Sequence, residues 1–470
     1  MARKRRIEVE IEAEQNDANN NAKKIQRYVD HVNHIKSLDS AQYLRLIVKP
    51  ITQTLEQPLS SLISPSAKLV LEKHIPRFIP IYSKIRKMRE YLQTPVDTIG
   101  CSTLPIYLNS SILPFVNNTS SAYSIVDPTN DGPNTGKIKI PKPTDIRLQI
   151  LIALMLSSQT KDEMTCKAMT RLMEYCVEEE LDAEAGISLK SLQLIQEDVL
   201  NELISCVGFH SRKAKYIKKT ISIITNDNTS NTLDLPYLYD ELISLPGVGP
   251  KMANLFIQAA WQWDEWGIGV DVHVDRMTRM FKWLPNSKNN KNPEETRIFL
   301  QNNLPLSLWN EINPVLVGFG QTVCIPRRTK CDLCYCNDIC PGVIKGGKME
   351  NRLGKYSSIE EWVSNVKDQL PIVFDRDGQE EKIMQLFSLP DGSTIKEENT
   401  IIKNEKVVGV EDSAIKQENT EDDLNNIKLE EEEEEKEKEG ADEITKENSI
   451  NVTPTKKIPK KRKIVSKYFK

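Results

Sequence analysis

The stretch LPGVGPKMANLFIQAAWQWDEWGIGVDVHVDR, residues 245–276, decides the fold. It opens with a glycine turn at 247–249, and Lys251 stands near the start of a run whose apolar residues have helical spacing. After a glycine-containing loop, Asp271 occupies a position typical of the first residue of a further helix. The turn, the lysine and the carboxylate together form one candidate site.

Composition predicts a folded middle between two polar ends. Hydrophobic residues make up 39% and charged residues 28% of the 470 residues, as in ordinary soluble proteins. The net charge of −4 averages a strongly acidic tail with a more basic body. No apolar run has the length of a membrane span, and the acidic residues after MARKRR argue against a secretory signal or transit peptide. We therefore expect the nine cysteines to be reduced, and a cluster of them to bind metal.

Apolar spacing and turn signals predict an all-α chain, because helical patterns recur and strand signals are nearly absent. Residues 1–40 are expected to be a disordered extension with a helix near 21–38. The chain then divides, by composition and pattern, into the following segments: helices and a long Ser/Asn-rich loop over 41–140, a helical domain over 141–280, helices and a cysteine loop over 281–345, an extension over 346–390 with one helix in GKYSSIEEWVSNVKD, and a disordered acidic tail over 391–470 that ends in a basic cluster.

The glycine turn has the features of a phosphate-binding nest. Gly247 and Gly249 allow backbone conformations that other residues resist, and the helix after Val248 offers free N–H groups at its start. The alternative is a plain corner between two helices. Lys251 is a candidate nucleophile, since a helix N-terminus and partial burial both disfavour its ammonium form. A lysine that only binds phosphate is the alternative.

Asp271 is the candidate carboxylate partner of the lysine. It could activate the amine or stabilise positive charge that develops on a substrate during attack. A role as a helix cap is the alternative, and one side chain can fill both roles. Asp275 is a rival on the same helix face, four residues further on.

Four cysteines have the spacing of a compact metal site. Cys324, Cys331, Cys334 and Cys340 give C-x6-C-x2-C-x5-C within seventeen residues. Zinc is one reading, although zinc ribbons usually separate their two cysteine pairs by a dozen or more residues. The fifth thiol in this loop, Cys336, is not expected to be a ligand. Between the first two ligands lie basic side chains suited to DNA phosphates, Arg327 and Arg328.

These motifs resemble the endonuclease III family of DNA glycosylases over roughly residues 84–345. The resemblance rests on GVGxK at the turn, VDxH from Val270, LSSQTKD at 156–162, PVD at 95–97 and the cysteine spacing. It implies a helix-hairpin-helix glycosylase fold, with a six-helix barrel domain over 141–280 and a [4Fe–4S] cluster domain to which residues 41–140 and 281–345 belong. It also implies Asp271 rather than Asp275 as the carboxylate, and four cysteine ligands.

The same resemblance assigns residues to DNA contact. Gln159 would fill the space left by an extruded nucleotide, and Phe209 would wedge between bases of the opposite strand. The basic run that includes Arg212 and Lys213 would contact backbone phosphates. A polar loop residue, a core aromatic and a solvated helix face are the corresponding alternatives.

The resulting hypothesis is a bifunctional DNA glycosylase and AP lyase that acts on oxidised pyrimidines in double-stranded DNA. An adenine-mismatch glycosylase, which generally lacks the lysine, and a non-catalytic helix-hairpin-helix module are the alternatives. The tail predicts a nuclear protein through KKIPKKRK (456–463), with a mitochondrial share left open, and a monomer is expected. Four Ile-Lys-x-Glu units resemble SUMO-acceptor sites, at Lys396, Lys403, Lys416 and Lys428.

Overall fold

The computed structural model describes residues 22–47, 51–111, 141–226, 234–285, 292–327, 329–342 and 356–372. Within these ranges the chain is helical and forms no strand, which confirms the all-α prediction; a single antiparallel bridge joins Leu92 to Ile372. No helix in the described ranges has the length and apolar character needed to cross a membrane. Two hydrophobic cores organise the helices.

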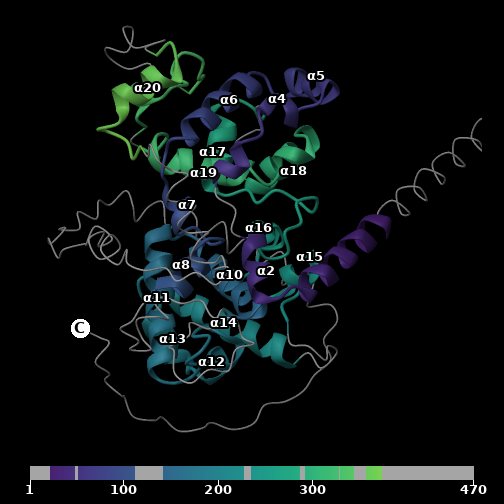
Figure 1. The fold of residues 1–470 in the computed structure, drawn as a ribbon, viewed down its shortest axis with the longest axis vertical. Helices are drawn as coiled ribbons and strands as arrows, with labels where there is room; N and C mark the ends of the chain where they lie inside the picture. Colours follow the sequence, from purple (N-terminus) through teal and green to yellow (C-terminus); the bar gives the residue numbers. More distant parts are fainter. Residues whose placement is uncertain are drawn as a thin grey trace, which may run out of the picture. The chain divides into compact units, whose positions relative to one another are not determined.

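The first core surrounds α10 (Pro143–Ser157), which is buried on every side from Ile146 to Leu156, as expected for a helix with no polar face. Pro143 fits the first helical position, where a missing N–H costs nothing. This core contains eight further described helices that are labelled with α10 in the middle and lower part of Figure 1. They are α2 (Ser40–Ile47), α8 (Leu104–Ser111), α11 (Asp162–Glu178), α12 (Leu189–Leu194), α13 (Glu197–Leu203), α14 (His210–Asn226), α15 (Tyr239–Ser244) and α16 (Pro250–Ala260).

The second core surrounds α19 (Ile312–Thr322), which packs against α6 (Phe78–Arg89), α7 (Pro95–Thr98) and α17 (Val272–Met280). Buried ion pairs join these helices, because Arg86 binds Glu311 (3.2 Å) and Arg89 binds Asp97. The remaining elements of this core are α3 (Ile51–Leu55), α4 (Leu59–Leu62), α5 (Pro65–His74), α18 (Pro293–Asn303), the short 3-10 helices η1 (Leu306–Leu308) and η2 (Cys331–Leu333), and α20 (Ile359–Val366).

The N-terminal boundary differs from the prediction. Residues 22–37 form the helix expected near 21–38, but this helix is packed rather than part of a disordered extension. Tyr28, Val32 and Ile35 are buried in the first core, and the Tyr28 hydroxyl donates to the carbonyl of Tyr237 (2.6 Å). The prediction of disorder is therefore wrong from residue 22 onward, because these apolar side chains share one helix face.

Two other predicted boundaries also move. Helices α2 and α8 were placed with the cluster domain in 41–140, but both belong to the first core. The predicted barrel domain ended at residue 280, yet Ile268, Val270 and the buried face of α17 belong to the second core. The chain thus passes from one core to the other just before Ile268, so Lys251 and Asp271 come from different cores.

The extension after the cysteine loop contains the predicted helix. It is α20, and its Trp362 is fully buried with Nε1 donating to the carbonyl of Leu333 (2.7 Å). The Tyr356 hydroxyl donates to the carbonyl of Asp332 (3.2 Å). These two bonds hold the backbone of the cysteine loop from outside. The predicted tail at 391–470 lies beyond the described residues.

Candidate active site

Helices α15 and α16 form the predicted hairpin, and its turn requires glycine at one position. Gly247 has φ of +80°, and a Cβ there would lie 2.5 Å from the Tyr216 ring, which packs on the turn from α14. Gly249 is extended, with open space where its Cβ would be. Open space beside the first N–H groups of α16 suits the approach of a phosphate.

Lys251 and Asp271 occupy the starts of two helices, as predicted. Lys251 is the second residue of α16 and is partly exposed. Asp271 is the N-cap of α17, is 9% exposed, and accepts the N–H of Val274 at Oδ1 (2.8 Å). The expected cap is therefore present, and the second carboxylate oxygen remains for other partners.

Two further residues place these helix starts near each other. Asp162 in the first turn of α11 and His273 on α17 both feel the charges of Lys251 and Asp271. Burial raises the pKa of Asp162, which the Gln321 amide partly offsets by donating to Oδ2 (2.7 Å). Burial lowers the pKa of His273, whose ring lies against Gly320 of α19; a Cβ there would be 2.5 Å from Nδ1.

The sequence had assigned no role to Asp162, although it belongs to the LSSQTKD motif. The charges of Lys251 and Asp271 both act on its carboxylate, so Asp162 lies close to these two helix starts. An acidic residue at a helix start is usually attributed to the helix dipole alone, which explains why it was missed. The Cys101 thiol lies in the same surroundings, and burial raises its pKa to about 11.

The alternative carboxylate, that of Asp275, forms hydrogen bonds to other residues. Asp275 accepts from Nε of Arg279, one turn further along α17, at 2.9 and 3.1 Å, and also from the hydroxyl of Thr296. These bonds bind α17 to α18. The Asp275 oxygens thus hold α17 to α18, whereas the Asp271 carboxylate caps the start of α17.

Gln159 and Phe209 lie at the tips of two adjacent loops. Both have left-handed backbones, with φ of 48° and 54°, which is uncommon outside glycine. The Gly208 N–H donates to the Thr160 hydroxyl (3.3 Å), and a Cβ on Gly208 would lie 3.2 Å from the Gln159 carbonyl. Gln159 is exposed and Phe209 is half-buried, so both tips are presented side by side.

The basic run after Phe209 divides into two kinds of side chain. Arg212 is exposed and lies over the Phe209 ring, 5.7 Å from its centroid. Lys213 is only 5% exposed, and its Nζ donates to the carbonyls of Leu156 (2.8 Å) and Ser158 (2.6 Å). The geometry does not support the predicted phosphate contact for Lys213, because its ammonium is inside the protein.

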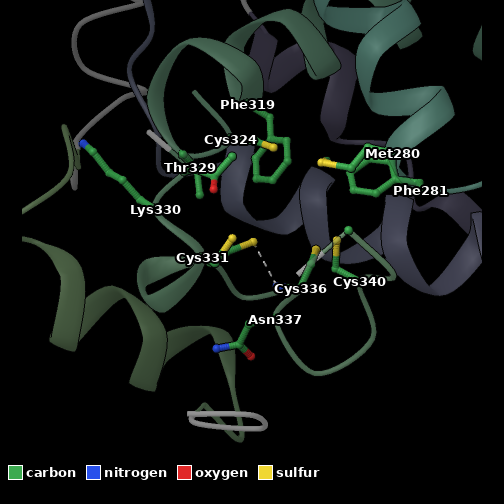
Figure 2. A pocket seen from close by; sticks show the side chains of 13 residues that line it. Met280, Phe281, Phe319, Cys324, Thr329, Lys330, Cys331, Cys336, Asn337 and Cys340 are labelled. Atoms are coloured by element: carbon green, nitrogen blue, oxygen red, sulfur yellow. Dashed lines mark hydrogen bonds between the residues drawn. The ribbon is translucent and has the colours of Figure 1, made fainter. Parts of the chain in front are cut away.

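The four predicted ligand cysteines border one pocket in the second core. Figure 2 shows Cys324, Cys331, Cys336 and Cys340 around it, and Cys334 completes the lining. Burial raises the pKa of Cys340 to about 12, and also raises that of Cys324. Thiols in such surroundings become thiolates when a metal supplies positive charge.

The donors around these sulfurs fit a thiolate-bound group. The Cys336 N–H donates to Cys334 Sγ (3.3 Å), and Arg276 on α17 donates to Cys324 Sγ (3.6 Å) and to its carbonyl (2.6 Å). The Cys336 thiol itself donates to the carbonyl of Ile81 (3.6 Å). Among the described residues, no three Cys, His, Asp or Glu side chains are arranged around a single metal ion.

The basic residues between the first two cysteines are only partly described. Arg327 is exposed and has φ of 63°, whereas Arg328 lies outside the described residues.

Residues 152–305 match the family of HhH-GPD superfamily base excision DNA repair proteins, which gives the class of protein that the hairpin and its site define. The matched stretch contains Gln159, Phe209, the glycine turn, Lys251 and Asp271.

Comparison with curated proteins identifies the family within this superfamily. The chain is 43% identical over 263 residues to Endonuclease III homolog 2 of Saccharomyces cerevisiae, which covers 56% of this chain and 62% of that protein. It is 41% identical over 302 residues to Endonuclease III homolog 1 of the same yeast, covering 63% and 68%. It is 43% identical over 258 residues to Endonuclease III-like protein 1 of Gallus gallus, covering 55% and 75%. The chain belongs to the endonuclease III family.

Solved structures include a trapped endonuclease III–DNA covalent intermediate, at a TM-score of 0.36 and 24% identity over 42% of this chain and 84% of that one. Family membership rests on the sequence relatives. The match spans less than two thirds of the first yeast relative's length.

Proposed function

We propose that this chain is a bifunctional DNA glycosylase and AP lyase that removes oxidised pyrimidines from double-stranded DNA. The observation that carries the proposal is the pairing of two helix starts. Lys251 follows the glycine turn on α16, Asp271 caps α17, and Asp162 and His273 feel the charges of both. A plain binding module has no need of a lysine and a buried carboxylate whose charges act on the same two side chains.

The proposed chemistry requires the Lys251 amine in its unprotonated form together with the Asp271 carboxylate. The Lys251 amine attacks C1′ of the deoxyribose, and the C1′–N bond breaks as the base leaves with the electron pair and takes up a proton. The nitrogen gives one proton to the departing base and the other to O4′ as the C1′–O4′ bond breaks and the sugar ring opens, and a Schiff base to C1′ results. Loss of a C2′ proton then expels the 3′ phosphate, which nicks the strand. Asp271 stabilises the positive charge that develops at C1′ and accepts protons from the amine.

DNA would bind across the start of α16 and the two loop tips. The N–H groups after Gly249 would hold a phosphate, and Arg212 and Arg327 would add phosphate contacts. Gln159 would fill the vacated space and Phe209 would enter the opposite strand. Their side-by-side left-handed tips support this role, since a protruding pair of side chains suits entry into a duplex.

A [4Fe–4S] cluster held by Cys324, Cys331, Cys334 and Cys340 is the cofactor we propose. When bound it supplies a rigid brace for its loop. The cysteine spacing supports a cluster over zinc, because zinc ribbons usually separate their two cysteine pairs by a dozen or more residues. Arg276 on α17 donates to the cysteine loop, and Asp271 is the N-cap of the same helix. Helix α17 therefore connects the cysteine loop with the Asp271 carboxylate.

Borohydride trapping tests the function. Wild-type protein should form a covalent complex with a duplex that contains thymine glycol, and Lys251→Ala should form none while still binding the duplex. Lys161→Ala provides a matched control at another loop near the site. Binding without trapping by the wild type would contradict the lyase proposal, and trapping by Lys251→Ala would move the nucleophile elsewhere.

The adenine-mismatch alternative is separated in the same assay, because such an enzyme would release adenine opposite 8-oxoguanine and would not trap through a lysine. Nuclear location, a mitochondrial share, a monomeric state and SUMO modification remain proposals from sequence. Lys396, Lys403, Lys416 and Lys428 all lie outside the described residues. Mass spectrometry of tail lysines from stressed cells tests the modification, and unmodified lysines at all four sites would contradict it.

A further inference from the structure

Lys213 lies in α14 but extends to the end of α10. Its Nζ donates to the carbonyls of Leu156 and Ser158 and to the Thr160 hydroxyl (3.1 Å). The last carbonyls of a helix have no partners within the helix, and the helix dipole makes that end negative. A buried ammonium therefore satisfies and neutralises the end of α10, where the loop with Gln159 begins.

The loop that Lys213 contacts carries a conformational cost. Gln159 stands between Ser158 and Thr160, both of which bind Nζ, and has the left-handed backbone noted above. A non-glycine residue in this region of backbone conformation persists only when its surroundings fix it. The Lys213 bonds on both sides of Gln159 provide such fixation.

The contact also reaches the second loop. Thr160 Oγ1, which accepts from Lys213, accepts from the N–H of Gly208 as well. Phe209 follows directly, and its carbonyl accepts the N–H of Lys213 (3.0 Å). One ammonium group thus joins the end of α10, the Gln159 loop and the Phe209 turn.

We propose that Lys213 is a positioning residue that presents Gln159 and Phe209 to DNA as one rigid pair. The inference rests on the proposed function, in which these two side chains enter the duplex. Removal of the ammonium would release the Gln159 backbone from its left-handed conformation. Restoring that backbone conformation would then cost free energy on each encounter with damaged DNA, and binding at the lesion would be weaker.

The same helix offers a matched control. Lys218 Nζ donates to three carbonyls at the end of α12, those of Leu192 (2.7 Å), Gln193 (3.0 Å) and Ile195 (2.7 Å). Lys218 therefore has the same kind of helix-end contact as Lys213, but it lies away from the Gln159 loop. Its loss should affect stability and leave DNA contact alone.

A double-mutant cycle tests the inference. Dissociation constants are measured on full-length protein for a duplex with a tetrahydrofuran abasic analogue and for the undamaged duplex, together with melting temperatures. The set comprises wild type, Lys213→Met, Lys218→Met, Gln159→Ala and each lysine change combined with Gln159→Ala. Lys213→Met should weaken abasic-duplex binding about tenfold, which corresponds to about 1.4 kcal/mol, and add less than twofold once Gln159 is alanine. Lys218→Met should lower the melting temperature without changing binding.

Multiplicative effects of Lys213→Met and Gln159→Ala, or a Lys213→Met protein that behaves like Lys218→Met, would overturn the positioning role. If Lys213→Met does not fold, Thr160→Val removes the shared hydroxyl and should show the same dependence on Gln159. A wild type that traps with borohydride but gives a multiplicative cycle overturns this inference alone. A wild type with no preference for the abasic duplex overturns both the inference and the proposed function.

Discussion

The ring of Tyr216 lies directly over Gly247, so close that a Cβ on the glycine would come within 2.5 Å of Cδ2. The glycine turn is therefore shaped from outside by α14 as well as by its own sequence. Gly249, two residues later, meets no atom within 4 Å of its would-be Cβ. The two glycines of one motif consequently have different tasks.

Gly247→Ala and Gly249→Ala should separate these tasks. Gly247→Ala forces a side chain into a left-handed backbone and against a ring, and should cost about 1–3 kcal/mol of unfolding free energy. Gly249→Ala should leave stability within about 0.5 kcal/mol, since its Cβ points into open space, but should weaken DNA binding because that space is where a phosphate would approach. Urea unfolding and duplex binding measure the two effects, and an unstable Gly249→Ala protein would contradict this division.

Asp271→Asn should affect catalysis and Asp275→Asn should affect stability. An asparagine at 271 can still accept the Val274 N–H and caps as well as aspartate, so the fold should remain while the trapping rate falls about a hundredfold or more. Asp275→Asn weakens the pair with Arg279 and should cost about 1 kcal/mol, with trapping within twofold of wild type. Slower trapping by Asp275→Asn than by Asp271→Asn would reverse the assignment.

Cys340→Ala and Cys336→Ala should differ in bound iron. Cys340 is a proposed ligand, so its loss should release iron and visible absorption from the purified protein. Cys336 donates to the carbonyl of Ile81 and should leave the iron content unchanged, at a modest cost in melting temperature. Four iron atoms per chain in wild type and Cys336→Ala alike is the expected result, and equal loss in both variants would make Cys336 a ligand.

Asp145 should make stability depend on pH in a definite direction. Burial, followed by the charge of Asp182, raises its pKa from 3.8 to about 6. Because the folded state holds this proton more tightly than the unfolded state, the contribution is favourable below about pH 4 and is lost as pH rises through about 6. Asp145→Asn should therefore gain stability near pH 7, of the order of 1 kcal/mol after solvent screening, and gain none at pH 4. Urea unfolding at both values measures this, and an equal change at both would contradict it.

Local sequence patterns predicted most features of the candidate site. The glycine turn, Lys251 in the first turn of its helix and Asp271 as a cap all follow from short-range backbone chemistry, and all three are present. The choice between Asp271 and Asp275 as the carboxylate required the fold, because only the packing of α18 against α17 reveals the partners of Asp275.

The sequence did not reveal which basic side chains of α14 are buried. In the basic run after Phe209, Lys213 and Lys218 differ little in sequence from exposed Lys215 and Lys219. Their tasks depend on which helix ends lie opposite α14, which is a property of the fold. The N-terminal helix did carry a signal, since Tyr28, Val32 and Ile35 follow a helical period, but its polar surroundings masked it.

Tyr28 and Trp362 lie far outside the stretch 152–305 that matches the family, yet both are completely buried. The stretch that matches the family is therefore shorter than the stretch that the two hydrophobic cores need. A gene fragment cut at the edges of the shared stretch would expose the inner faces of both cores. Residues 22 and 372 are therefore safer limits for a minimal protein than 152 and 305.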